Sequence, residues 1–381
     1  MTFEFPKRGF VFWPVGTGDS TSIVIDSETI VQVDLRHLDK SDDDDDPAWS
    51  VVDELVKRLP KKDGRPYLAV FALSHPDEDH CKGFEKLLSS VTIGTLWFTP
   101  RIFGEHTKDL CDDAEAFKSE AKRRVEATLA AGRDPGAGDR VRIFGFSELL
   151  NMSAFSGFPT DLLTVPGGSV SIIDGVDRSG DFVAFVHAPF KDDDAGERND
   201  TSLGIQVTLF EGDARLRALL LGDLKYPIIK RIFELSEPDD LAWNVLLAPH
   251  HCSKSVMYWQ EEGDEEEKLK QGLLDKIGGA SENPNCIVSS SNPVPDSNES
   301  GDNPPHANAK KRYETLTSRF VCTMESPNKA NPEPVVVKFE GGKIMFSPGG
   351  GGSGGGGKSA SESASDARGT DDPPADAVTY G

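Results

Sequence analysis

The sequence is poor in cysteine and contains no long hydrophobic run. Its five cysteines among 381 residues are odd in number and show no paired spacing. A disulfide framework of the kind found in small secreted proteins is therefore excluded. No charged-then-apolar leader stands at the N-terminus, and no apolar run approaches the roughly 18 residues that a membrane helix needs. We expect a soluble, cytoplasmic chain with no membrane partner.

Positive charge is also scarce. Lys and Arg number 41 against 64 Asp and Glu, which gives a formal net charge of −23. This balance disfavours a general electrostatic grip on nucleic acid, because binding to phosphates requires clustered Lys and Arg. Part of the negative charge is local, as in Asp42–Asp46. A small basic site elsewhere in the chain remains compatible with this composition.

The chain has enough apolar residues for one large α/β domain with insertions. We predict this domain over residues 1–346, with insertions near 105–140 and 257–284. The Gly/Ser/Asp-rich segment 347–381 cannot bury a core and is predicted to be a disordered tail. Strands are predicted at 10–15, 22–26, 29–34, 67–73, 92–98, 182–187, 202–210, 216–221, 245–248, 286–289, 319–323, 335–340 and 343–346, and helices at 48–59, 84–88, 114–131, 226–235, 259–276 and 309–316.

The stretch Ser74–His80 carries the strongest chemical signal. It follows the apolar run Tyr67–Leu73 and places four metal-ligating side chains close together: His75, Asp77, Asp79 and His80. Imidazole and carboxylate suit Zn²⁺, Mn²⁺ or Fe, and a set this dense can supply two ions. A solvated acidic turn would explain the acidic residues but not two of the eight histidines in the chain. The pattern favours a metal site.

Two other predicted strands end in residues of the same chemistry. Gly222-Asp223 closes the run at 216–221, and His250-His251 follows the run at 245–248. Ligands at strand ends are pre-organised by the sheet, and Asp223 could bridge two ions. An Asx turn is the alternative role for Asp223. Adjacent imidazoles project in different directions, so one of the pair can bind a metal or contact substrate while the other is held elsewhere.

Together these motifs resemble the metallo-β-lactamase superfamily of binuclear metal hydrolases, and most closely the hydrolase domain of ComEC-type DNA-uptake proteins. The resemblance runs in order over nearly the whole chain. His75-x-Asp77-x-Asp79-His80 matches the HxDxDH variant of that group, in which Asp77 stands where most of the superfamily has a second His. The other matching segments are Val15–Ser20, Val31–Asp34, Asn199–Leu203, Gly222-Asp223, Pro249–Ser253 and, loosely, Ser289 to His306.

The resemblance implies a four-layer αβ/βα sandwich with two divalent ions, Zn or Mn, at one edge. His75 and Asp77 would hold one ion, Asp79 and His80 the other, and Asp223 would bridge them. The remaining histidine ligand is either His250 or His306, and His187 or Asp200 would complete the first site. Asp79, His250 and His251 are the implied catalytic residues, Asp79 orienting or deprotonating the attacking water and one of the histidines stabilising or protonating the leaving oxygen.

The chain departs from the family pattern in three places. Cys252 replaces a Gly, Cys81 directly follows His80, and the loop Asn292–Pro305 is longer and more polar than expected. Both cysteines could lie near the metals, or they could be small buried residues that fill space.

The function expected from these features is a metal-dependent hydrolase, a phosphodiesterase or nuclease acting on a small nucleotide or a single-stranded end. Fold-level resemblance does not fix the substrate, so a non-phosphate hydrolase of the same fold is an alternative. A third interpretation starts from the terminal Gly381 on a long polar tail, which looks like the ends activated by ubiquitin-like conjugation enzymes in bacterial anti-phage systems. An ordinary disordered terminus explains the same tail.

Overall fold

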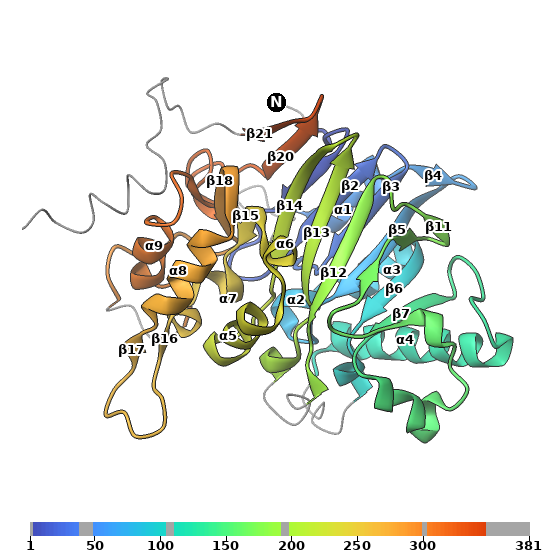
Figure 1. Cartoon of the computed structure of the whole chain (residues 1–381). Coiled ribbons are helices and arrows are strands. Elements are labelled where there is room, and N and C mark those ends of the chain that lie inside the picture. Colours follow the sequence, from blue (N-terminus) through green and yellow to red (C-terminus); the bar gives the residue numbers. More distant parts are fainter. Residues whose placement is uncertain (1–2, 38–48, 104–109, 192–197, 299–302, 348–381) are drawn as a thin grey trace, which may run out of the picture.

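The computed structural model describes residues 3–37, 49–103, 110–191, 198–298 and 303–347 (Figure 1). The acidic run Asp42–Asp46 and the chain beyond Ser347, including Gly381, lie outside the described residues. In the described part, no helix has both the length and the apolar character needed to cross a bilayer.

The first of two large sheets comes from the N-terminal half and the last hairpin of the chain. Within the described residues it has ten strands in the order β21-β20-β1-β2-β3-β5-β6-β7-β8, with β4 paired to β5. Strands β3, β5, β6, β7 and β8 are parallel to one another. The bounds are β1 Gly9–Phe12, β2 Thr21–Asp26, β3 Thr29–Val33, β4 Lys61–Lys62, β5 Arg65–Leu73, β6 Thr92–Phe98, β7 Arg140–Phe144, β8 Leu163–Thr164, β20 Val335–Glu340 and β21 Lys343–Ser347.

The second sheet has seven described strands in the order β19-β18-β15-β14-β13-β12-β9. Its neighbours β14, β15, β18 and β19 are parallel, so their carboxyl ends lie at the same edge. The bounds are β9 Ser169–Val170, β12 Phe182–Ala188, β13 Gly204–Glu211, β14 Ala214–Leu220, β15 Trp243–Leu247, β18 Ser281–Ser289 and β19 Phe320–Cys322. Two small hairpins are separate from both sheets: β10 Ile172–Ile173 with β11 Val176–Asp177, and β16 Tyr258–Trp259 with β17 Lys268–Leu269.

Helices cover the outer face of each sheet (Figure 1). Those from the first half of the chain are α1 Val51–Arg58, α2 Glu78–Cys81, α3 Phe84–Ser90 and α4 Asp112–Ala131. Those from the second half are α5 Tyr226–Leu235, α6 Pro238–Leu241, α7 Pro249–Cys252, α8 Gln271–Gly279 and α9 Ala307–Tyr313. Figure 1 shows α8 and α9 on the opposite side of the two sheets from α4.

The apolar side chains form three cores, and these define the layers. In β1, Phe10 and Phe12 pack between the two sheets, whereas Val11 packs outward beneath α1, α3 and α4. This alternation follows from the pleat, which turns successive side chains to opposite faces. In the second sheet, Leu220 packs inward and Leu219 outward against the apolar face of α5. The order is helices, sheet, sheet, helices, so the predicted four-layer αβ/βα sandwich is confirmed.

The sequence prediction was wrong at residues 259–276. The predicted single helix is instead the hairpin β16–β17 followed by α8 Gln271–Gly279. The run Glu261–Glu267 places like charges three and four residues apart, which disfavours a helix, and Gly263 takes φ +90° in the turn. The division of the chain into a domain at 1–346 and a tail at 347–381 stays a prediction; the last strand extends to Ser347.

Candidate metal centre

Several strand ends from the two sheets meet at one edge of the sandwich. β5 of the first sheet leads into Ser74–His80, and β14 and β15 of the second sheet lead into Asp223 and into His250 and His251. The turn between β1 and β2 brings Asp19 to the same place, because Asp19 N–H donates to the carbonyl of Asp79 at 3.1 Å. The site therefore depends on the packing of both sheets.

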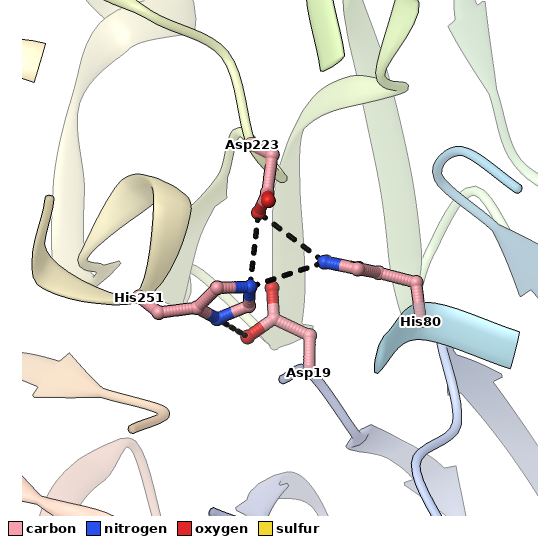
Figure 2. A group of neighbouring side chains, drawn as sticks. All are labelled: Asp19, His80, Asp223 and His251. Atoms are coloured by element: carbon pink, nitrogen blue, oxygen red, sulfur yellow. Dashed lines mark hydrogen bonds and ion pairs between the residues drawn. The ribbon is translucent and has the colours of Figure 1, made fainter. Parts of the chain in front are cut away.

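One group of ligand atoms is drawn in Figure 2. Asp19, His80, Asp223 and His251 are all buried, and one ligand atom from each lies within 4.8 Å of the others. His80 Nε2 lies 3.2 Å from His251 Nε2 and 3.2 Å from Asp223 Oδ1. His251 Nε2 also lies 3.3 Å from Asp79 Oδ2. We call the atoms from Asp79, His80, Asp223 and His251 the second ligand set.

A first ligand set lies on the other side of Asp223. His75 Nε2 is 3.5 Å from Asp77 Oδ2 and 3.9 Å from Asp223 Oδ2, and His250 Nε2 is 3.6 Å from the same Asp223 oxygen. Asp223 Oδ1 faces the second set and Oδ2 faces the first. One carboxylate thus lies between two groups of metal-ligating side chains.

The residues present fit two divalent cations. His75 Nε2 is buried and makes no hydrogen bond, although it points at two carboxylates. Distances of 3.5 to 3.9 Å are too long for good hydrogen bonds but suit atoms arranged around a shared ion. Imidazole nitrogen and carboxylate oxygen are ligands that both Zn²⁺ and Mn²⁺ accept.

The electrostatics of the second set also call for a cation. Burial alone would raise the pKa of Asp223, but the imidazoles of His251 and His80 hold that pKa well below its usual range. Burial alone would lower the pKa of His80, yet Asp223, Asp34 and Asp79 raise it well above its usual value. The buried carboxylates therefore attract positive charge strongly, which a bound divalent cation would supply in place of the imidazole protons.

Asp34 orients His80 from behind. Asp34 Oδ2 accepts hydrogen bonds from His80 Nδ1 at 2.8 Å and from Ser74 Oγ at 2.7 Å, and Oδ1 accepts from the Ser74 amide at 2.7 Å. The proton on His80 Nδ1 leaves Nε2 as the ligating atom. His251 is fixed in the same way, since its Nδ1 donates to the carbonyl of Ser290 at 3.1 Å. Such partners set ring orientation and ligand basicity.

We predict that Asp34→Asn weakens metal binding at the second set by about 10- to 100-fold. An Asn has one accepting oxygen, so its amide group would face either the Ser74 amide N–H or the donors on His80 and Ser74 Oγ, and the hydrogen bonds on that side would be lost. Titration of the metal-free protein with Zn²⁺ against a competing chelator measures the change. The matched control is Asp26→Asn, because Asp26 is the last residue of β2 and lies at the end of that strand away from the site. Wild-type affinity in Asp34→Asn would contradict the positioning role.

The backbone at the end of β15 is what turns both histidines toward Asp223. His250, His251 and Cys252 have φ values of 50°, 53° and 66°, in the left-handed region that non-glycine residues rarely adopt. Two neighbouring imidazoles consequently approach opposite oxygens of Asp223. Strain of this kind persists where surrounding structure enforces it, commonly at functional sites. Cys252 occupies, with positive φ, the position at which the family pattern has Gly.

The two unusual cysteines pack and do not join either ligand set in the described structure. Cys81 is buried in the core beneath α1, α3 and α4, and its Sγ lies 3.6 Å from Cys111 Sγ. Cys252 is buried in the core beside α5 and α8. The space-filling interpretation of these two residues fits their surroundings.

Of the remaining predicted ligands, His187 has partners outside the centre. His187 is not brought to it: Nδ1 accepts from Ser236 Oγ at 2.9 Å and Nε2 donates to the carbonyl of Asp240 at 3.1 Å. Burial lowers the pKa of His187 to about 4, so the ring is neutral. Both ring nitrogens are thus engaged away from the two ligand sets, and the assignment of His187 to the first site stays a prediction.

His306 and Asp200 lie in segments that contact residues next to the centre. His306 precedes α9, and its Nδ1 accepts from the amide of Lys254 at 3.2 Å. His306 is not among the atoms of either ligand set, whereas His250 Nε2 faces Asp223, and the choice between His250 and His306 stays a prediction. Asp200 lies in the 3-10 helix Arg198–Thr201, and Ser202 just beyond it accepts from the Asp223 amide at 3.4 Å. Asp200 stays a candidate for the first set.

Sequence reasoning missed Asp19 as a member of the group and treated His251 only as a catalytic residue. Asp19 lies in the turn within Val15–Ser20, a segment that the sequence analysis treated only as part of the family resemblance. The role of His251 depends on left-handed backbone that its residue type does not indicate.

Comparison with known proteins gives structural neighbours only. No family model and no curated protein matches the sequence. Solved structures that align with the chain include a B3 metallo-β-lactamase with an active-site glutamic acid, at 14% identity and TM-score 0.35, covering 73% of this chain and 85% of that one. A class B3 di-zinc metallo-β-lactamase from an Alaskan soil metagenome has 12% identity and TM-score 0.30, covering 73% and 91%. A subclass B3 metallo-β-lactamase of Bradyrhizobium japonicum has 14% identity and TM-score 0.32, covering 73% and 91%. At such low values the role of each residue rests on the geometry of this chain, and the nearer resemblance to ComEC-type domains stays a prediction.

Proposed function

We propose that this protein is a hydrolase that uses two divalent ions, Zn or Mn, to cleave phosphodiesters. The observation that carries the proposal is the position of Asp223, whose two oxygens face two separate ligand sets. His75, Asp77 and His250 would hold one ion. Asp79, His80 and His251 would hold the other, with Asp19 beside them. Asp223 would bridge the two.

When bound, the ions supply Lewis acidity and a water that ionises near neutral pH. The chain's own residues then orient the reaction. The Asp79 side chain is one-third exposed and that of Asp77 one-quarter, while Asp223 is buried. Both carboxylates can reach incoming water, and Asp79 is the one in the second ligand set. Asp79 orients this water and takes its proton. The water oxygen bonds to phosphorus, and the bond from phosphorus to the leaving oxygen breaks with its electron pair.

His250 lies on the substrate side of the centre. Its side chain is 17% exposed, whereas that of His251 is 1% exposed. His250 Nδ1 lies 3.3 Å from Ser255 Oγ, which fixes the ring while Nε2 faces Asp223. His250 therefore either completes the first ligand set or contacts the leaving oxygen, which must gain a proton. Loss of one metal from His250→Gln supports the first role, and retention of both metals with slower turnover supports the second.

The carboxylate ligands bear on the choice of metal. Asp77 replaces an imidazole with a hard anionic oxygen, which suits Mn²⁺ as well as Zn²⁺. Lys225 and Lys254 lie next to His250 and provide positive charge where a phosphate diester would enter. The non-phosphate hydrolase remains the alternative, because the same metal chemistry acts on acyl groups.

The test begins with metal content. Mass-spectrometric elemental analysis of the purified full-length chain is expected to find two divalent metals, and fewer than two would overturn the binuclear assignment. A panel of methyl p-nitrophenyl phosphate, p-nitrophenyl acetate and a chromogenic β-lactam then separates the substrate classes. We expect hydrolysis of the diester with Mn²⁺ or Zn²⁺. Turnover of the acyl substrates alone would leave the metal centre standing and replace the phosphodiesterase assignment.

The conjugation hypothesis rests on Gly381, which lies outside the described residues. No feature of the described residues favours it over an ordinary terminus, and it stays a prediction from the sequence.

A further inference from the structure

Two cysteines from separate segments of the chain meet next to the second ligand set. Cys81 Sγ lies 3.6 Å from Cys111 Sγ, although the two residues are 30 positions apart in the sequence. Both are free thiols. A disulfide joins its sulfurs at about 2.05 Å, so an approach of about 1.5 Å separates this contact from a covalent bond. A small movement of the two segments that carry the cysteines is therefore enough for a disulfide to form.

Cys111 is the more reactive member of the pair. It is half-buried and is the N-cap residue of α4, where the positive end of the helix dipole favours a thiolate. The hydrogen bond with the Cys81 thiol lowers the pKa of the Cys111 thiol to about 6. Burial and nearby carboxylates raise this pKa, and the backbone amide of Ala114 lowers it. Partly exposed thiols that are ionised near neutral pH are the ones that oxidants attack.

Cys81 is the buried member of the pair. Its side chain belongs to the core beneath α1, α3 and α4 and is 0% exposed, so an oxidant in solution reaches it only through Cys111. Space filling explains why Cys81 is buried in this core, but it does not explain the contact of its sulfur with a second thiol. An accessible thiol with another thiol beside it, ready to form a disulfide, is the arrangement of reversible cysteine redox sites.

A disulfide at this position would act on the metal ligands through α2. This helix has four residues, and Cys81 directly follows His80 in it. The start of α4 is held more firmly, because the Asp113 carboxylate accepts hydrogen bonds from the amides of Gly83 and Glu85 at 2.8 and 2.9 Å. Beyond this point α4 is a helix of 20 residues packed on the core. The approach of the two sulfurs should therefore displace the short helix, and His80 with it.

The reduced pair also makes a hydrogen bond that a disulfide cannot make. The Cys81 thiol donates to the carbonyl of Asp77 at 3.2 Å, and oxidation removes the proton of this bond. Ligating side chains must be held within about 0.5 Å of their productive geometry. A displacement of about 1.5 Å, even when it is shared between two segments, is large enough to misplace a ligand. Oxidation of the pair is thus linked to weaker metal binding.

We propose that Cys81 and Cys111 form a redox site that a hydroperoxide closes to a disulfide, and that this disulfide weakens metal binding at the second ligand set. The Cys111 thiolate attacks the peroxide, so that a sulfur–oxygen bond forms, the oxygen–oxygen bond breaks and water leaves. The Cys81 sulfur then attacks the sulfenic acid of Cys111, the sulfur–sulfur bond forms, and a second water leaves with the Cys81 proton. The two sulfurs lose two electrons, which the peroxide gains. The inference goes beyond hydrolysis, and its effect on the metal rests on the metal centre of the proposed function.

The disulfide is tested first, without metal. Metal-free full-length protein is treated with hydrogen peroxide, and intact-mass spectrometry is expected to show the loss of two hydrogen atoms, with peptide mapping that joins Cys81 to Cys111. Tris(2-carboxyethyl)phosphine should restore the starting mass. Cys111→Ser should lack the link, whereas the matched control Cys286→Ala should form it as the wild type does, because Cys286 is buried in a different core from Cys81. Peroxide treatment that does not join Cys81 to Cys111 overturns the proposal.

Zinc binding measures the effect on the metal centre. Reduced and oxidised protein are each titrated with Zn²⁺ against a competing chelator, and the oxidised form is expected to bind about tenfold more weakly at the second ligand set. By linkage, saturating Zn²⁺ should raise the reduction potential of the disulfide by about 30 mV, which corresponds to tenfold for two electrons. Cys111→Ser should bind Zn²⁺ with the same affinity before and after peroxide, which separates the disulfide from oxidation elsewhere in the chain.

The outcomes separate this proposal from the proposed function. If the disulfide forms and both states bind Zn²⁺ equally, redox control of the metal centre is wrong and the hydrolase stands. The hydrolase also stands if Zn²⁺ binds but no disulfide forms. If neither reduced nor oxidised protein binds Zn²⁺, the metal centre of the proposed function is wrong, and the control of metal binding by the cysteine pair is wrong with it.

Discussion

Asp223→Asn is expected to reduce diester hydrolysis by about a thousandfold or more and to lower the metal content from two ions to one or fewer. Asp223 is the residue that both ligand sets share, through Oδ1 on one side and Oδ2 on the other. An Asn has the same shape as Asp but offers only one ligating oxygen. Its amide nitrogen, which cannot ligate a metal ion, would face the other ligand set. Losing one ion removes several kcal/mol of transition-state stabilisation, which corresponds to this loss of rate.

The measurements are kcat/KM on methyl p-nitrophenyl phosphate and elemental analysis of the same preparation. Asp213→Asn is the matched control: Asp213 is exposed in the turn of the same β13–β14 hairpin, at the end opposite Asp223. Circular dichroism and the thermal unfolding midpoint should show that both variants fold. An Asp223→Asn protein that retains two metals and wild-type turnover would rule out a bridging carboxylate.

Much of the sandwich was predictable because its strands and helices carry strong local patterns. β6 at Thr92–Phe98, α5 at Tyr226–Leu235 and β20 at Val335–Glu340 have the predicted bounds. Each has either a continuous apolar run or an apolar face at helical spacing. The local preference of these segments therefore agrees with the structure that tertiary packing requires. Helix ends and short strands were less well predicted, and the segment between β7 and β12 was missed because its strands are only two residues long.

The arrangement of the site was predictable only where it follows from strand ends. The carboxyl ends of β5, β14 and β15 place His75, Asp223 and His250 together, as their positions after apolar runs indicated. The parts that depend on long-range contacts were not predictable. The neutral His187 ring makes a hydrogen bond with each of its nitrogens, and one of the two partners, Ser236, lies 49 residues away in the sequence. The approach of His251 to Asp223 depends on three successive residues with positive φ.

The same geometry has a consequence for stability. At the described edge of the sandwich, Asp34, Asp79 and Asp223 surround His80, and their negative charge is balanced in the metal-free chain mainly by protons on His80 and His251. Bound cations would replace these protons and cross-link loops from both sheets. Because an unfolded chain cannot offer this preformed set of ligands, metal binding should stabilise the folded state selectively.

Removing the metals with a chelator is therefore expected to lower the thermal unfolding midpoint by roughly 5–10 °C. A ligand present at 100 times its dissociation constant stabilises the folded state by about 2.7 kcal/mol, so two ions contribute about 5 kcal/mol. The unfolding entropy of about 2.1 cal/mol/K per residue makes each kcal/mol shift the midpoint of a chain of this size by about 1–2 °C. Differential scanning calorimetry of chelated protein, before and after Zn²⁺ or Mn²⁺ is returned, measures the shift. In Asp34→Asn the metal-dependent part should be smaller, because His80 is no longer oriented. An unfolding midpoint that changes neither on chelation nor on metal addition would mean that the two ligand sets hold no ion in the folded protein. The hydrolase proposed from these ligand sets would then be wrong as well.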